Sequence, residues 1–151
     1  MIASCLPDTL LAYLYGGAPA LMLSMGVDGY PHAAYTWTAA PDPHRVRFGV
    51  DRATTTFDNL HRNERAALQI IGRRGLLFIV KGPVRLIKDG IAAVPFGLSM
   101  MELAVVEVKN QAWREVTVAP LAYEWVDGQR QTMPATEQAI YAELRNWKPE
   151  T

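Results

Sequence analysis

Three consecutive threonines, Thr54, Thr55 and Thr56, have the residue type and the position to bind a ligand. They lie in DRATTTFDNL, between an alternating apolar run and a segment with helical spacing. A threonine hydroxyl at a helix start accepts a hydrogen bond from a backbone amide, and the unused amides of a helix N-terminus can bind phosphate. The stretch therefore predicts a helix cap, either alone or combined with contact to a phosphate.

Charged residues on both sides belong to the same turn. Asp58 lies three residues after Thr55, where it would form a weak capping box. Asp51 ends the preceding apolar run, either as a turn residue or as part of a site. Arg52, just before the threonines, is a candidate to balance the charge of a phosphate.

Motifs for other chemistries are missing from the sequence. There is no G-x-G-x-x-G, no G-x-x-x-x-G-K-S/T and no G-x-S-x-G. His32, His44 and His61 form no pair on one helix, the acidic residues form no evident catalytic pair, and Cys5 is the single cysteine. We therefore predict no metal site, assign no catalytic residue and expect any enzymatic chemistry to depend on an organic cofactor.

The chain is expected to be a globular cytoplasmic protein. Of its 151 residues 50% are hydrophobic, and 15 basic side chains balance 15 acidic ones. This neutrality argues against binding to nucleic acid or to anionic membranes, which relies on a basic surface. No apolar run approaches the roughly 18–20 residues of a membrane span, and the first residues lack the pattern of an export signal. We expect one domain, residues 1–151.

Strands joined by tight turns dominate the expected elements. Asp28-Gly29 predicts a type I′ hairpin turn, and Gly82-Pro83 predicts a bulge or an edge strand. Alternating or apolar runs predict strands at 20–27, 30–39, 45–51, 66–71, 76–87 and 102–110, with one more possible at 121–131.

Alternation within two strands predicts which side chains share a face. On the second strand Tyr35 and Trp37 would pack on one face, with Thr36 on the other. On the third strand Val46, Phe48 and Val50 are expected to point inward. Arg45, Arg47 and Gly49 are expected to point outward.

Helical spacing predicts an N-terminal helix at about 7–15, a short helix at 57–63 and a C-terminal helix at about 135–147. Trp147 would either anchor the last helix by apolar packing, the reading we favour, or cover the cofactor cleft of a partner subunit. The barrel would occupy about residues 20–126. Many strands with few helices indicate a mainly β fold, an antiparallel barrel with peripheral helices.

The segment 88–101 is irregular and apolar, and it includes Met100 and Met101. Its side chains must be covered by another surface, and a partner subunit is one candidate. This observation favours a homodimer.

Taken in order, the elements resemble the FMN-binding split β-barrel family that includes pyridoxamine 5′-phosphate oxidase. The resemblance covers roughly residues 6–110. It is carried by the passages LMLSMGVDGYPHAAYTW, VRFGVDRATTTFDNLHRNERAALQI and LLFIVKGPVRLI. The closest local matches are D-G-x-P-H and N-L-x-x-N-x-R-A-A-L.

This resemblance implies a six-stranded antiparallel split barrel that dimerises and binds FMN in clefts between subunits. The flavin phosphate would lie at the turn from the third strand into the short helix. The implied cofactor-binding residues are Tyr35, Thr36, Trp37, Val50, Asp51, Arg52, Thr54, Thr55 and Thr56.

Several positions depart from the family pattern. Alignment on Asn59-Leu60 puts Thr54 at the serine and Thr56 at the lysine of the usual phosphate loop. Ala34 stands where the family has an arginine, and Leu77 where it has a glutamine. The segment that binds the substrate of pyridoxamine phosphate oxidases has no match here.

Two hypotheses follow. The first is an FMN-dependent oxidoreductase that acts on a small molecule. The second is a non-catalytic or differently loaded barrel dimer that has lost FMN and binds another ligand or a protein partner. The missing lysine and arginine motivate the second.

Overall fold

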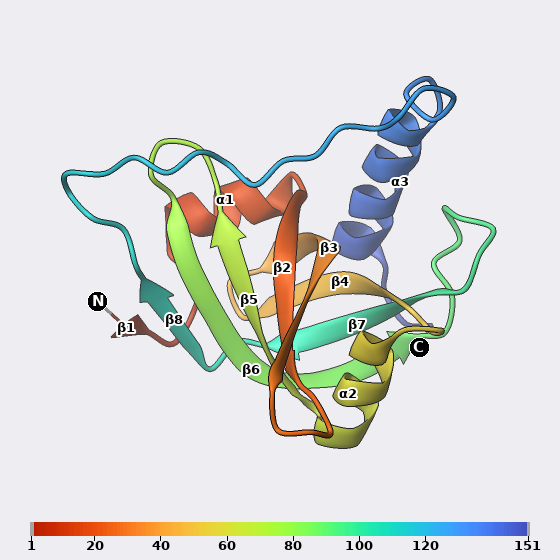
Figure 1. Ribbon diagram of the computed structural model, residues 1–151, viewed down its shortest axis with the longest axis horizontal. Coiled ribbons are helices and arrows are strands. Elements are labelled where there is room, and N and C mark those ends of the chain that lie inside the picture. Colours follow the sequence, from red (N-terminus) through yellow and green to blue (C-terminus); the bar gives the residue numbers. More distant parts are fainter. Residues whose placement is uncertain (1, 151) are drawn as a thin grey trace.

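Six antiparallel strands close into a barrel in the computed structural model, which describes residues 2–150 (Figure 1). Around the barrel the order is β6-β5-β2-β3-β4-β7, and β7 pairs back onto β6. The strands are β2 (Ala18–Met25), β3 (Pro31–Asp42), β4 (Arg45–Asp51), β5 (Arg65–Ile71), β6 (Leu77–Lys88) and β7 (Leu98–Ala104). The predicted mainly β, six-stranded antiparallel barrel is confirmed.

Two short strands and three helices surround the barrel (Figure 1). β8 (Glu107–Asn110) pairs with β6, and β1 (Ile2–Ala3) pairs with β8. The helices are α1 (Asp8–Tyr15), α2 (Thr55–Asn63) and α3 (Met133–Asn146). All three lie close to their predicted positions. No helix within residues 2–150 is long and apolar enough to cross a membrane.

The β2–β3 hairpin lies where Asp28-Gly29 predicted it, but its turn is not type I′. Gly26 N donates to the carbonyl of Tyr30 at 2.8 Å, and Gly29 N donates to the carbonyl of Gly26 at 3.0 Å. Only Gly29, with φ 84°, has a positive φ within this turn. A type I′ turn needs positive φ at both central residues, so the chain uses a three-residue loop that ends in glycine.

Two strand predictions are wrong in the C-terminal half. The run 102–110 is broken at Val105 and Val106, where the amides donate to the carbonyls of His44 and Lys81, so that β7 and β8 are separate strands. Residues 121–131 form no strand. They belong to a long coil that passes over the barrel from β8 to α3 (Figure 1), and the barrel strands therefore end before residue 126.

Helix α3 covers much of the apolar segment 88–101 within the same chain, and residues 98–101, which were predicted to be irregular, belong to β7. Ile91 and Val94 are buried in a cluster with Leu98 and Met100 and with Ile140 and Leu144 of α3. Glu143 of α3 also accepts hydrogen bonds from Lys88 Nζ and from the amides of Ala92 and Ala93. Within this segment Ile91, Val94, Leu98 and Met100 are therefore covered without a partner subunit, whereas Phe96 is 48% exposed.

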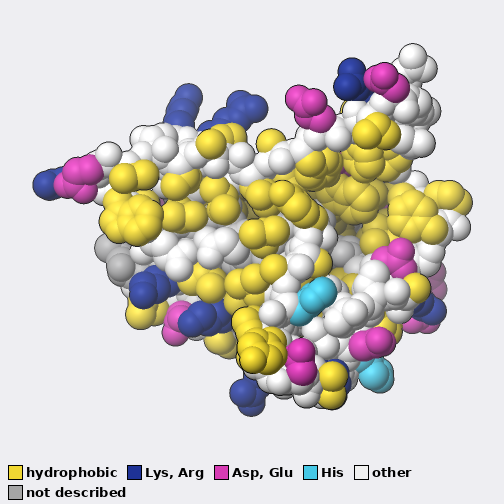
Figure 2. Space-filling model, viewed as in Figure 1, with side chains coloured by type: hydrophobic (Ala, Val, Ile, Leu, Met, Phe, Trp, Pro, Cys, Tyr) yellow, Lys and Arg dark blue, Asp and Glu magenta, His cyan; other side chains and the backbone are white. Residues whose placement is uncertain are grey.

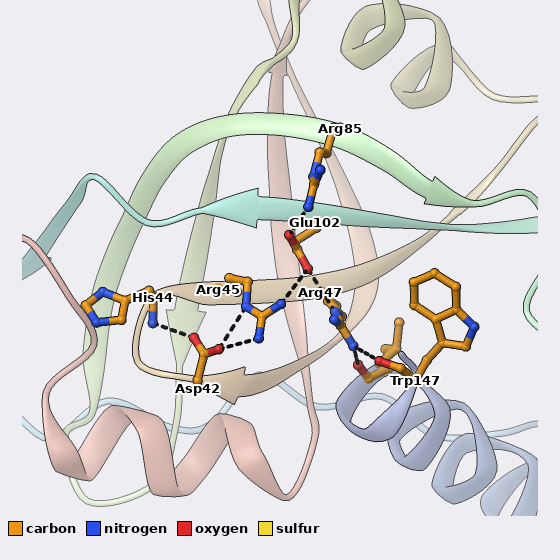
Figure 3. A network of polar contacts seen from close by, with 8 residues as sticks. Asp42, His44, Arg45, Arg47, Arg85, Glu102 and Trp147 are labelled. Carbon is orange, nitrogen blue, oxygen red and sulfur yellow. Dashed lines mark hydrogen bonds and ion pairs between the residues drawn. The ribbon is translucent and has the colours of Figure 1, made fainter. Parts of the chain in front are cut away.

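A buried ion pair joins the barrel to the end of α3 (Figure 3). Arg47 was predicted to face outward, but it is only 3% exposed, and its Nε lies 3.0 Å from Glu102 Oε2. Its Nη1 donates to the carbonyls of Leu144 and Trp147 at the C-terminal end of the helix. Arg45 and Arg85 also contact the Glu102 carboxylate. The face of β4 that points away from the barrel interior is buried at Arg47, because α3 packs over it.

Trp147 anchors the end of α3, as predicted. Its side chain packs against the cluster beneath the helix, and the Arg47 guanidinium lies 5.8 Å from the centre of its ring. This geometry allows a cation–π interaction in addition to the hydrogen bond with the Trp147 carbonyl.

Gly82 marks the place where β6 bends away from β8 and begins to pair with β7. A Cβ built at Gly82 would lie 1.8 Å from the carbonyl oxygen of Ala104. We expect Gly82→Ala to lower the free energy of unfolding by about 3 kcal/mol, because the added methyl group would clash with the backbone of Ala104, which cannot move aside as a flexible side chain can. Gly90→Ala is the control, since no atom lies within 4 Å of its Cβ. Equal urea midpoints for the two variants would contradict this account.

For the buried ion pair we expect Arg47→Met to lower the free energy of unfolding by about 3 kcal/mol, because Glu102 loses a buried partner and α3 loses its carbonyl contacts. Arg85→Met should cost less than about 1 kcal/mol, because the Arg85 side chain is 75% exposed. Chemical denaturation measures both. Similar losses for the two variants would mean that Arg47 does not dock the helix.

Candidate functional site

A cavity of about 460 Å³ opens where β3 and β4 meet the start of α2. Hydrophobic side chains gather over this part of the surface, between α3, the 89–97 loop and α2 (Figure 2). The cavity is lined by Met22, Ala34, Tyr35, Thr36, Trp37, Gly49, Val50, Asp51, Thr54, Thr56, Phe96, Leu98, Tyr123 and Trp125.

Most of the residues that the sequence implied for cofactor binding lie together around this cavity. Arg52 and Thr55 are outside its lining. The residues brought together are Tyr35, Thr36 and Trp37 of β3, Val50 and Asp51 of β4, and Thr54 and Thr56 at the start of α2.

The threonine turn is a helix cap, and Thr54 is the capping residue. Its Oγ1 accepts from Phe57 N at 3.3 Å and donates to the carbonyl of Asp51 at 2.6 Å. Asp51 Oδ1 accepts from Ala53 N at 2.9 Å and holds the preceding turn. The capping box expected between Thr55 and Asp58 is not formed, because the helix starts one residue earlier than that pattern requires.

Thr55 and Thr56 differ in what they face. Thr56 is 5% exposed and lines the cavity, whereas Thr55 is exposed on the outside of the helix. The hydroxyl of Thr56 makes no hydrogen bond to another residue within 2–150, so it remains available to a ligand.

Arg52 does not supply a cation to the turn. Its Nη2 lies 2.9 Å from Asp89 Oδ1, and its Nε donates to Ser99 Oγ at 3.0 Å. These contacts tie the residue that follows β4 to the start of the 89–97 loop and to β7, and Arg52 is not part of the cavity lining. The arginine is thus directed toward a carboxylate that the sequence gave no reason to pair with it.

The floor of the cavity is formed by the pairing of β3 with β4. Thr36 is 8% exposed, and its hydroxyl donates to the carbonyl of Gly49 at 2.7 Å. Val50 is buried beside it. Since its hydroxyl is already bonded to backbone, Thr36 contributes shape more than a free polar group.

Seven lining residues were not among the predicted site residues, namely Met22, Ala34 and Gly49 of the strands together with Phe96, Leu98, Tyr123 and Trp125. Phe96 and Leu98 come from the loop before β7 and from its first residue, and Tyr123 and Trp125 come from the coil that crosses the barrel. The alternation of AYEWV suggested a strand, which hid the possibility that its aromatic residues turn toward a cavity.

Trp37 and Tyr123 meet a carboxylate of α3. The indole nitrogen of Trp37 donates to Glu137 Oε2 at 2.8 Å, and the hydroxyl of Tyr123 donates to the same oxygen. Burial and the hydrogen bond to Glu137 raise the pKa of Tyr123 well above its usual value. Burial likewise raises the pKa of Tyr141. Both phenols therefore remain neutral at physiological pH.

The chemical character of the lining is apolar and aromatic. Among the described lining residues, Asp51 carries the only charged side chain, and neither lysine nor arginine is present. Within residues 2–150 no group of three His, Cys, Asp or Glu side chains is arranged to hold a metal ion. The arrangement suits a planar apolar ring, with hydroxyl and amide groups at one end.

Comparisons by sequence gave no relative. No protein-family model matches the chain, and no curated protein matches its sequence.

Solved structures with this fold do exist. An F420 reductase superposes with a TM-score of 0.61 at 16% identity, covering 70% of this chain and 100% of that one. Pyridoxamine 5′-phosphate oxidase-like proteins from Lactobacillus delbrueckii and Listeria innocua give TM-scores of 0.60 and 0.57 at 15% and 16% identity. They cover 71% and 69% of this chain and 95% and 96% of their own. The chain shares the split β-barrel fold of these proteins.

The cap of α2 gives a direct test of the threonine turn. Thr54→Ala should lower the free energy of unfolding by about 1 kcal/mol, because the amide of Phe57 loses its acceptor. Thr55→Ala should leave it within about 0.5 kcal/mol, since Thr55 is exposed. Urea denaturation measures both. A larger loss of stability for Thr55→Ala than for Thr54→Ala would mean that Thr54 is not the capping residue.

Proposed function

We propose that this protein binds FMN in the cavity beside α2 and acts as a flavin-dependent oxidoreductase on a small molecule. The observation that carries the proposal is the cavity itself: residues implied by the sequence from β3, β4 and the threonine turn lie around one space of about 460 Å³. The fold, shared with an F420 reductase and with pyridoxamine 5′-phosphate oxidase-like proteins, is consistent with it.

One part of the cavity suits the flavin ring. Val50, Leu98 and Met22 offer apolar surface, and Tyr35 and Trp37 offer aromatic surface. A lining of this kind removes water from a planar ring and holds it by dispersion and stacking.

The opposite part suits a phosphate less well. Thr56 offers a free hydroxyl, and the start of α2 offers backbone amides near Thr54. A hydrogen bond from a neutral donor to a charged phosphate contributes about 1.5–3 kcal/mol, but a hydroxyl or an amide lacks the full opposite charge that a lysine or an arginine brings. Since Arg52 is paired with Asp89, the phosphate would be held by neutral donors alone.

The protein's contribution to a reaction would be positional. A bound flavin supplies the capacity to accept and donate electrons or hydride. The residues around the cavity would orient the ring and exclude water. Thr36, whose hydroxyl is bonded to the carbonyl of Gly49, would keep the β3 backbone fixed against the ring. No side chain of the lining has the environment of a general acid or base.

A second candidate is a barrel that binds a planar ligand without a phosphate. The absence of lysine and arginine from the described lining favours this alternative, because Asp51 would repel an anion. The protein would then retain the fold and the ring-binding surface while lacking FMN.

The homodimer remains a prediction. One argument for it has been removed, since α3 covers Ile91 and Val94. Light scattering at micromolar concentration measures the assembly directly.

We expect the purified protein to bind flavin and to bind FMN about tenfold more tightly than riboflavin, the difference expected of one hydrogen bond to the charged phosphate. Thr56→Ala should weaken FMN binding and leave riboflavin binding unchanged, because its hydroxyl would contact only the phosphate. Absorption spectra and titrations monitored by flavin fluorescence measure these affinities. Thr55→Ala, outside the cavity, is the matched control.

The outcomes separate the two candidates. Equal affinity for FMN and riboflavin, unaffected by Thr56→Ala, would favour a site for the ring alone. A colourless protein that takes up neither flavin would contradict the FMN proposal.

A further inference from the structure

One side of the cavity is an aromatic wall made of Tyr35, Trp37, Tyr123 and Trp125. Tyr35 and Trp37 come from β3, and Tyr123 and Trp125 come from the coil before α3. The rings of Tyr35 and Tyr123 meet edge to face with centres 6.0 Å apart, and those of Tyr123 and Trp125 do so at 5.5 Å. Edge-to-face contacts of this kind are favourable and fix the relative orientation of the rings.

Glu137 of α3 holds three members of this wall from behind. Its Oε1 accepts from the indole nitrogen of Trp125 at 2.7 Å. Its Oε2 accepts from the indole nitrogen of Trp37 at 2.8 Å and from the hydroxyl of Tyr123. Hydrogen bonds to a carboxylate are roughly twice as strong as neutral ones, so one charge fixes three rings.

The backbone does little to position the coil part of the wall. Residues 122–125 belong to no strand and make no backbone-to-backbone hydrogen bond with other residues of the described chain. The nearest such bond joins Leu121 N to the carbonyl of Ile71. The positions of Tyr123 and Trp125 therefore depend on their side chains, and above all on Glu137.

Glu137 itself does not line the ligand cavity. It lies on a neighbouring depression with Tyr13, Arg73 and Pro120. Because the polar atoms of Trp37, Tyr123 and Trp125 are bonded to Glu137, the wall offers a ligand the carbon surface of its rings and few free donors. With Asp51 as the one charged group of the described lining, an anionic ring would be disfavoured.

We propose that the aromatic wall binds a planar aromatic ring without negative charge, and that Glu137 is the positioning residue that keeps the wall in place. The inference rests on the proposed function in one respect, because the uncharged ring of a flavin is the first candidate for this surface. It extends that function by assigning ring recognition to the coil and to α3.

The test compares two probes and two glutamates. Lumiflavin carries the flavin ring without a phosphate, and 9-aminoacridine is a planar tricyclic cation unrelated to flavin. We expect Glu137→Ala to weaken the binding of both probes at least tenfold and to shift tryptophan emission, because Trp37 and Trp125 lose their acceptor. Glu137→Gln keeps one acceptor oxygen and should lose less.

Glu124 provides the matched control. It lies between Tyr123 and Trp125, and its exposed side chain has no hydrogen-bond or ion-pair partner within residues 2–150. Glu124→Ala and Glu124→Gln remove the same charge from the same part of the molecule and should leave both affinities unchanged. Equal losses for the Glu124 and Glu137 variants would attribute the effect to net charge and overturn the proposal.

A purely structural role gives a different result. If Glu137→Ala lowers the melting temperature while the folded protein binds both probes with unchanged affinity, the positioning role is wrong. Should this variant not fold, Trp125→Leu removes one ring and leaves the bond between Glu137 and Trp37 intact. It should weaken both probes at least fivefold, and unchanged binding would overturn the proposal.

The two proposals fail separately. Binding of 9-aminoacridine without any flavin binding would contradict the FMN proposal and support the aromatic wall. If the wild-type protein binds neither probe, the proposal that the aromatic wall binds a planar ring is overturned.

Discussion

The site depends on how the C-terminal helix is fixed to the barrel, and a buried charge does this. Arg47 and Glu102 are 3% and 4% exposed, and such charges are tolerated in an interior only when each is paired and hydrogen-bonded. Arg47 meets this condition by bonding Glu102 on one side and the last carbonyls of α3 on the other. Those carbonyls have no partner inside the helix, so the same guanidinium satisfies two requirements.

Once α3 is fixed, its acidic residues Glu137 and Glu143 determine two sides of the cavity. Glu143 holds the 89–97 loop through Lys88 and two backbone amides, and this loop brings Phe96 to the cavity. Glu137 holds the coil that brings Tyr123 and Trp125. The strands supply the floor, but the helix determines how enclosed and how aromatic the site is.

The threonine turn has a different role from the one its composition first suggests. Thr54 is committed to the cap and Arg52 to Asp89, which leaves Thr56 as the hydroxyl that faces the cavity. Among the described residues, no lysine or arginine lines the cavity. A ligand bound here would therefore be held mainly by apolar and aromatic contacts rather than by a cation.

The sequence by itself determined the barrel, the three helices and the elements that surround the candidate site. These follow from local patterns: alternation in strands, the turn at Gly29, and a threonine before a helix. The predicted residues of β3, β4 and α2 lie around one cavity for the same reason, since neighbouring strands and the turn that follows them stay together in any such barrel.

Only the tertiary structure decided which side chains are inside and which partners they find. The alternation along β4 places Arg47 on the outward face of the strand. Arg47 is nevertheless buried, because a helix from the C-terminal part of the chain covers it. Trp37 and Glu137 are 100 residues apart, and no local pattern links them. Hydrophobic alternation records whether a face is covered, but it does not identify the segment that covers it, and here that segment completes the site.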